Sequence, residues 1–141
     1  MAISLKRTLT LTSTSGASGV SEDSSLALSV ADTLTVTDPM IGISRVQCTT
    51  TGGDTVILPN TTTTRYVYIK NTGLTGADAA DTAEIASGVT VKVELADNTR
   101  IVDLGADEFC FFPYNAEGSG YLQLEASDST VVVEYGYWTK V

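Results

Sequence analysis

The chain has 141 residues and a mass of 14.8 kDa, which fits one folded domain. Hydrophobic residues make up 43% of it, enough for a core and too many for a disordered chain. Seventeen acidic and eight basic residues give a formal charge of −9, and a surface of that sign repels nucleic acid. The absence of histidine excludes imidazole bases and zinc sites with histidine ligands.

The first segment alternates apolar and polar residues. Its apolar members share one parity, so residues 3–11 are expected to form a β-strand: Ile3, Leu5, Leu9 and Leu11. The same segment carries Lys6 and Arg7 but no continuous apolar run after them, unlike a signal peptide. The longest apolar runs elsewhere are strand-sized and far below the roughly 18 residues of a membrane span. We therefore expect no cleaved export signal and no membrane partner.

A Ser/Gly-rich stretch with the properties of a flexible link follows this first strand. We divide the chain into an N-terminal strand or arm (1–14), a Ser/Gly-rich link (15–25) and a β-sandwich domain (26–141). Because the link separates the first strand from the rest, we expect that strand to be an arm that pairs away from its own chain, by adding an edge to a neighbour's sheet.

The remaining sequence continues the period of two and is rich in β-branched Thr and Val. Nine further strands are expected, at 26–36, 41–48, 54–58, 64–70, 89–95, 100–103, 108–112, 120–126 and 130–138. The turn formers at residues 97–98 and 127–128 predict hairpins, and the Ala-rich stretch 76–86 is either a short helix or a long surface loop. This pattern predicts an all-β, single-domain antiparallel β-sandwich that is jelly-roll-like.

Few residues have the chemistry of a catalytic site. Asp103 with Asp107 or Glu108 would supply a carboxylate pair of the glycosidase kind, but acidic residues beside turns are typically solvated turn formers. Cys48 and Cys110 allow one disulfide at most, and we expect both to be reduced, buried, small hydrophobes. We therefore expect a protein that is not an enzyme and has no cofactor.

One acidic loop has the residue type of a metal site. Asp78, Asp81 and Glu84 place three hard oxygen ligands close together, as calcium prefers, although their spacing differs from that of an EF-hand loop. An exposed acidic loop explains the same three residues, and we expect no metal. More generally, residues 101–139 hold seven acidic residues and no basic one, which suits either docking on a basic protein surface or simple solubility.

Aromatic residues cluster near the C-terminus. In a strand, Phe109 and Phe111 face one way and Phe112 the other, so both faces are apolar and need cover. One cover is the domain's own core, and a second subunit would be the other. Trp138 suits an interface anchor or a core position equally. The candidates for a partner or oligomer interface are Leu9, Leu11, Phe112, Tyr114, Tyr137 and Trp138.

Four stretches of this chain resemble parts of the small all-β virion structural proteins of tailed bacteriophages. The runs 108–114, 120–126 and 131–138 look like the closing hairpins of those proteins, and 66–73 is similar to a strand and turn that they use. The resemblance covers about a third of the chain. It implies a non-enzymatic protein, made in the host cytoplasm, that braces the shell at the capsid surface as a decoration or cement protein.

The same resemblance implies the major capsid protein of the phage as partner and a homo-oligomer, commonly a trimer, with neither nucleic acid nor membrane bound. A tail, baseplate or fibre protein is the first alternative, because such components share this style of fold. A carbohydrate-binding module is the second. It would require Trp138 and some of four tyrosines on one exposed face: Tyr66, Tyr68, Tyr121 and Tyr137.

Overall fold

The alternating, β-branched sequence folds into strands. The computed structural model describes residues 3–12, 27–39, 42–50, 55–59, 63–75, 83–85, 88–115 and 120–140, and within these ranges it contains no helix. Twelve strands run in chain order: β1 (Ile3–Thr12), β2 (Ala27–Pro39), β3 (Ser44–Cys48), β4 (Thr55–Leu58), β5 (Arg65–Asn71), β6 (Leu74–Thr75), β7 (Ala83–Glu84), β8 (Val91–Leu95), β9 (Arg100–Leu104), β10 (Phe109–Tyr114), β11 (Leu122–Ala126) and β12 (Val131–Lys140). Each of the ten expected strands has its counterpart, and β6 and β7 are additional.

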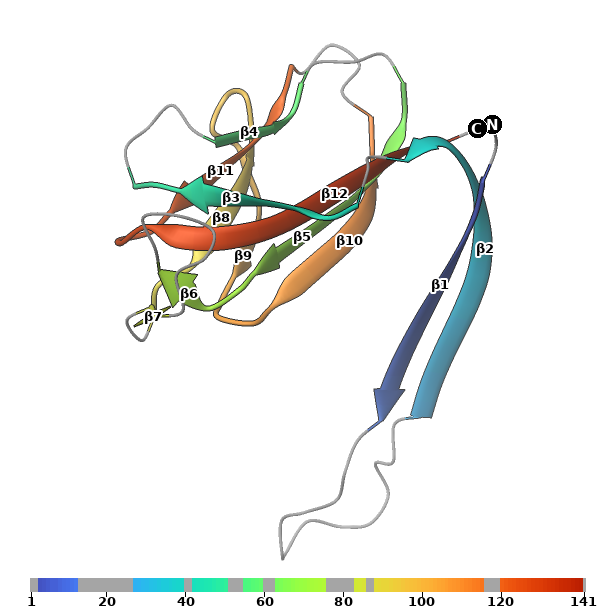
Figure 1. Ribbon diagram of the computed structural model, residues 1–141, viewed down its shortest axis with the longest axis horizontal. Coiled ribbons are helices and arrows are strands. Elements are labelled where there is room, and N and C mark those ends of the chain that lie inside the picture. Colours follow the sequence, from blue (N-terminus) through green and yellow to red (C-terminus); the bar gives the residue numbers. More distant parts are fainter. Residues whose placement is uncertain are drawn as a thin grey trace, which may run out of the picture.

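The larger sheet is built around β12. Its strand order is β1-β2-β12-β5-β10, with β3 also paired to β12, and every pairing is antiparallel. One side of β12 pairs with β5, while the other pairs first with β3 and then, near its end, with β2. Figure 1 shows β2 continuing beyond this contact, away from the sandwich, with β1 beside it.

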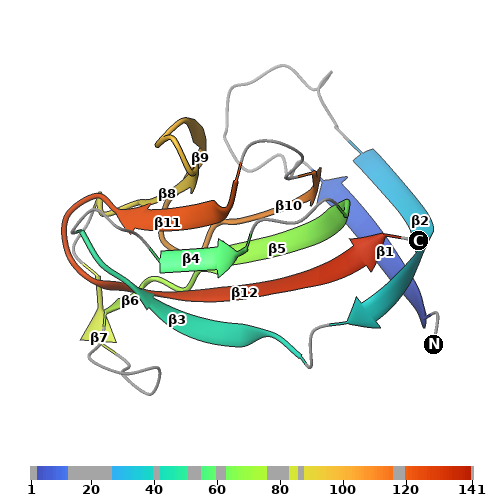
Figure 2. The same cartoon turned by 90° about the horizontal axis from the view of Figure 1, so that it is seen from above.

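The smaller sheet has the order β4-β11-β8-β9, again antiparallel, and it packs against β3, β12, β5 and β10 of the larger sheet. Figure 2 shows the two layers from above. Both contribute buried side chains to one core, as a sandwich requires. The larger sheet supplies Cys48, Val67, Ile69, Tyr114, Val131 and Val133, and the smaller sheet supplies Ile57, Leu58, Val91, Val93, Leu104, Leu122, Leu124 and Ala126. The predicted all-β sandwich is confirmed.

Of the two predicted hairpins, one is confirmed and one is wrong. β8 and β9 pair across the turn at Asp97. β11 and β12 do not pair, because β11 already has β4 on one side and β8 on the other. The turn at Ser127 instead carries the chain from the smaller sheet to the larger. Its backbone N–H donates to the carbonyl of Thr90, which fixes this crossing.

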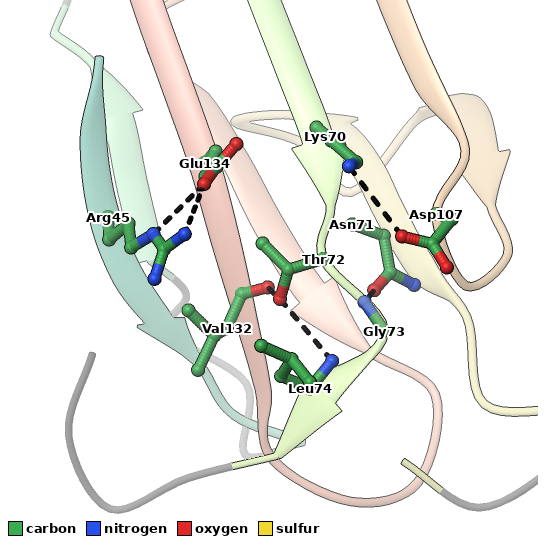
Figure 3. Close-up of polar contacts among 9 residues, drawn as sticks. All are labelled: Arg45, Lys70, Asn71, Thr72, Gly73, Leu74, Asp107, Val132 and Glu134. Carbon is green, nitrogen blue, oxygen red and sulfur yellow. Dashed lines mark hydrogen bonds and ion pairs between the residues drawn. The ribbon is translucent and has the colours of Figure 1, made fainter. Parts of the chain in front are cut away.

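A turn after β5 is held by the polar side chains of Asn71 and Thr72 (Figure 3). Asn71 is fully buried, donates from Nδ2 to the carbonyl of Leu104 at 3.0 Å, and accepts the N–H of Gly73 at 2.9 Å. Thr72 donates from Oγ1 to the carbonyl of Val132 at 2.7 Å. These side-chain hydrogen bonds satisfy backbone groups that have no partner strand at the turn. Asn and Thr side chains have this role in many turns.

Part of the stretch 76–86, which was predicted as a helix or a loop, is a short strand at residues 83–84. These form β7, which pairs with β6, so the helix is wrong there. Residues 76–82 and 86 lie outside the described part of the chain. Neither cysteine forms a disulfide, as predicted; Cys48 is fully buried and Cys110 is partly buried.

Candidate interaction surface

The first two strands form an arm. β1 pairs with β2 along its whole length, from Ile3 opposite Val36 to Thr12 opposite Ala27. The first strand therefore does pair with its own chain, contrary to expectation, whereas the addition of its other edge to a neighbour's sheet stays a prediction. The sequence indicated a one-stranded arm, whereas the arm is two-stranded and joins the sandwich through the end of β2 (Figure 1). The predicted link 15–25 lies outside the described residues.

The arm is amphipathic across its two faces. On one face Leu9 lies opposite Val30 and Arg7 opposite Asp32, with Leu34 next along β2. The Arg7 guanidinium pairs with the Asp32 carboxylate at 3.0 Å. The described residues of the other face are polar or small and exposed: Ser4, Lys6, Thr8, Thr10, Ser29, Ala31 and Thr33.

A second apolar surface lies on the side of the larger sheet that faces away from the core. We call it the outer aromatic face, and it consists of Tyr66, Tyr68, Phe109, Phe111 and Trp138. The rings of Tyr66 and Phe111 stack with centroids 5.9 Å apart, and Phe111 and Trp138 are 6.3 Å apart. Tyr68 and Phe109 form a further pair at 6.2 Å. Such distances give favourable aromatic contacts beyond simple burial.

The root of the arm covers part of this face. Leu34 and Val36 pack against Tyr66, Phe111 and Trp138, and their exposed fractions are 7% and 1%. The Arg7 guanidinium lies over the Tyr66 ring, 5.9 Å from its centroid. The arm and the stacked ring of Phe111 leave Tyr66 only 6% exposed.

Both apolar surfaces continue beyond this contact. Along the arm, Leu9 is 47% exposed and Val30 is 52% exposed. Along the outer aromatic face, Phe109 is 60% exposed and Tyr68 is half-buried. Exposed apolar side chains side by side on a strand pair are a common feature of surfaces that bind other proteins.

The predicted interface residues divide among the arm, the outer aromatic face and the core of the sandwich. Leu9 is exposed on the arm and Trp138 lies on the outer aromatic face. Phe112, Tyr114 and Tyr137 point inward and pack in or against the core, so they serve the chain's own fold. Leu11 occupies a register position in β1 opposite Leu28. The contact of Leu34 and Val36 with the outer aromatic face was not predicted. Their alternation is visible in the sequence, but the surface that they contact is not.

The acidic residues considered for chemistry have structural partners. Asp103 pairs with Arg100 at 3.0 Å, and Asp107 lies 3.6 Å from the Lys70 ammonium. Glu108 accepts the backbone N–H of Gly105 at 2.7 Å. This arrangement is that of ion pairs and turn formers, and it brings no pair of free carboxylates together.

The acidic loop with the three candidate metal ligands is only partly described. Glu84 is exposed on β7, whereas Asp78 and Asp81 lie outside the described residues. Within the part of the chain that the structure describes, no three potential metal ligands gather.

Titratable groups near the two faces respond mainly to burial. Burial raises the pKa of the Cys110 thiol to about 11, so the thiol is protonated at neutral pH. Burial also raises the pKa of Tyr68, with the Glu134 carboxylate adding to the effect. Neither group therefore provides a nucleophile at neutral pH.

The chain matches no protein-family model, no curated protein and no solved structure with which it was compared. Among the described residues, no helix is long and apolar enough to span a membrane.

Proposed function

We propose that this chain is a non-enzymatic virion structural protein of a tailed bacteriophage, which decorates the capsid surface and stabilises the head shell. The observation that carries the proposal is the amphipathic arm, whose Leu9 and Val30 are about half exposed. A shell protein holds its neighbours through extended surface contacts rather than through a cleft. The sequence resemblance to small all-β virion proteins supports the same class.

The physics of a shell suits such a protein. A clamp that binds the expanded lattice better than the unexpanded one stabilises the expanded state by that difference in affinity. Many copies on a symmetric shell make weak contacts strong through avidity. The acidic residues of the C-terminal third favour docking on a basic patch of the major capsid protein.

We also infer that the sandwich is of the jelly-roll type. The body strands form two four-stranded sets, β3-β12-β5-β10 and β4-β11-β8-β9. Most chain connections in the body cross from one set to the other, as in a double Greek key. This strand order supports the assignment, which matches the style of fold implied by the resemblance.

The sugar-binding alternative fits the surface less well. It requires Trp138 and tyrosines on one exposed face, but Trp138 is partly buried against Leu34 and Val36, and Tyr66 is buried. Phe109 is the one exposed ring of this face, and it lacks the polar group that tyrosine and tryptophan bring to a sugar platform.

The test is binding to particles. Purified protein is mixed separately with expanded heads that lack decoration and with isolated tails of the encoding phage, and bound protein is measured after sedimentation. We expect saturable binding to heads and a higher temperature of shell disruption. Binding to tails alone would assign the chain to the tail, baseplate or fibre, and binding to neither would overturn the virion proposal.

A further inference from the structure

Each copy of the chain carries two apolar surfaces that its own fold leaves uncovered. One is the pair Leu9 and Val30, which lies beyond the Arg7–Asp32 ion pair along the arm. The other is the pair Tyr68 and Phe109 on the outer aromatic face. Figure 1 shows the distal half of the arm directed away from the sandwich, so these two surfaces lie on separate parts of the molecule.

We propose that the distal arm of one copy docks on the outer aromatic face of a second copy of the same chain. Leu9 and Val30 of one copy would then cover Phe109 and Tyr68 of the next. The inference rests on the proposed function for its setting, a homo-oligomer on a shell, but the contact itself is a property of the free protein.

The first support is continuity with a contact already made within the chain. The same face of the arm packs on the same aromatic face at its root, where Leu34 and Val36 are almost fully buried against Tyr66 and Phe111. The two surfaces are therefore chemically compatible. Extending this contact to a second copy covers exposed aliphatic groups with exposed rings, which the hydrophobic effect favours.

The second support is charge. The arm is close to neutral, because Lys6 and Arg7 of β1 are balanced by Asp32 and Asp38 of β2, while residues 42–141 hold thirteen acidic and six basic residues. Two acidic side chains, Asp107 and Glu108, immediately precede Phe109 and are exposed. The acidic body of one copy repels the acidic body of another, whereas a neutral arm meets no such repulsion, which favours contact of arm with body over contact of body with body.

The edge of the sheet limits how the contact forms. β10 is an edge strand in the described sheet, and Pro113 in it has no N–H with which to bind an added strand. Docking therefore uses side chains on the sheet face. Because the two surfaces differ, the contact closes either as a reciprocal twofold pair, in which each arm docks on the other copy, or as a heterologous ring such as a trimer.

The first experiment measures the mass of the free protein by light scattering at several concentrations, with no particle present. We expect a concentration-dependent oligomer. The double variant L9S/V30S should weaken association about tenfold or more, because it removes two apolar side chains from the contact. The matched control is T8S/A31S, which changes the opposite face of the same strand pair and should associate like the unmodified chain. A strict monomer, or equal loss in both variants, overturns the inference.

The second experiment identifies the contact by disulfide trapping in a C110A background, where the remaining Cys48 is fully buried. A chain with V30C is mixed with a chain with F109C under a mild oxidant. We expect a covalent pair of one V30C and one F109C chain, and much less of it when A31C replaces V30C. Pairs of V30C with itself alone would mean that arms contact arms and would overturn the inference. Particle binding is measured separately, so failure here is distinct from failure of the virion proposal.

Discussion

The indole ring of Trp138 lies against the backbone of Gly136. A Cβ at residue 136 would come 3.3 Å from Cη2 of Trp138, which is closer than ordinary van der Waals contact. Gly136 is buried as a result, although it lies on the outer side of the sheet. Because Gly136 has no side chain, the indole lies close to the sheet and takes part in the cluster where Leu34 and Val36 of the arm are buried.

Gly136→Ala should therefore disturb the root of the arm. The added methyl group pushes the indole outward, and we expect a loss of about 1 to 2 kcal/mol in the free energy of unfolding. Trp138 is the only tryptophan, so its fluorescence in a denaturant titration reports on this site directly. Thr139→Ala, on the opposite side of the same strand, is the control. An unchanged emission spectrum in the Gly136 variant would contradict the contact.

Leu34→Ala should loosen the arm while leaving the sandwich folded. The variant removes most of a buried side chain from the contact with Tyr66 and Trp138, which costs about 2 kcal/mol or more. We expect a red shift of Trp138 emission and faster proteolysis within the arm, because the root no longer excludes water. Thr33→Ser, on the exposed face beside it, should change neither. Simultaneous unfolding of arm and sandwich would mean that the arm is part of the main cooperative unit.

Strand positions in this chain could be predicted from the sequence because alternation is a local signal. The parity of Phe109, Phe111 and Phe112 correctly indicated two apolar faces of one strand. Two-residue strands such as β6 and β7 carry no such signal, since two residues define no period.

Which strands pair with one another could not be predicted, because strand pairing is set by contacts between residues distant in sequence. Alternation placed strands before and after residues 127–128, but it does not say that β4 and β8 occupy both sides of β11. The pairing of β1 with β2 was missed for the same reason. Tyr66 was considered for a sugar-binding face, and only the position of Leu34 and Val36 over it shows that it is buried.

Replacing Asn71 should destabilise the whole sandwich. In Asn71→Ala the carbonyl of Leu104 and the N–H of Gly73 lose their side-chain partners in a fully buried place, which costs about 2 to 3 kcal/mol. The measurement is the denaturant midpoint at constant slope. Thr10→Ala, whose side chain is exposed on the arm, should cost far less. Equal effects of the two changes would argue against the buried role of Asn71.

The Cys110 thiol should react slowly and in a pH-dependent way. Burial raises its pKa from 9.0 to about 11, so near pH 8 its thiolate fraction is about a hundredth of that of an unburied cysteine. Because the pKa is raised on folding, the contribution to stability is fully present below pH 9 and is lost as the pH rises through 11. Alkylation rates between these pH values, with Cys110→Ala as control, measure the effect. Rapid alkylation at pH 8 would show that the thiol is not shielded.

Glu94→Gln should stabilise the protein, although it removes a charge from an ion pair. Glu94 is only 4% exposed and lies opposite the fully buried Gln123 in the register of β8 and β11. Within the described residues, Oε2 of Glu94 and Oε1 of Gln123 have no hydrogen-bond partner, so two buried acceptors lie on neighbouring side chains without a donor. The amide of the variant supplies that donor, which is worth about 1 kcal/mol.

The stability lost with the Glu94–Arg100 ion pair in this variant is small. Arg100 is 4.0 Å from Glu94, has a half-exposed side chain, and already pairs with Asp103 at 3.0 Å, so the lost attraction is worth a few tenths of a kcal/mol, on the order of an exposed pair. The matched control is Glu125→Gln on the same sheet face, which breaks the ion pair with Lys92 and supplies no donor to an unpaired acceptor. Thermal unfolding should rank Glu94→Gln above the unmodified chain and Glu125→Gln below it. If both variants were destabilised equally, the ion pair with Arg100 would outweigh the unpaired oxygens.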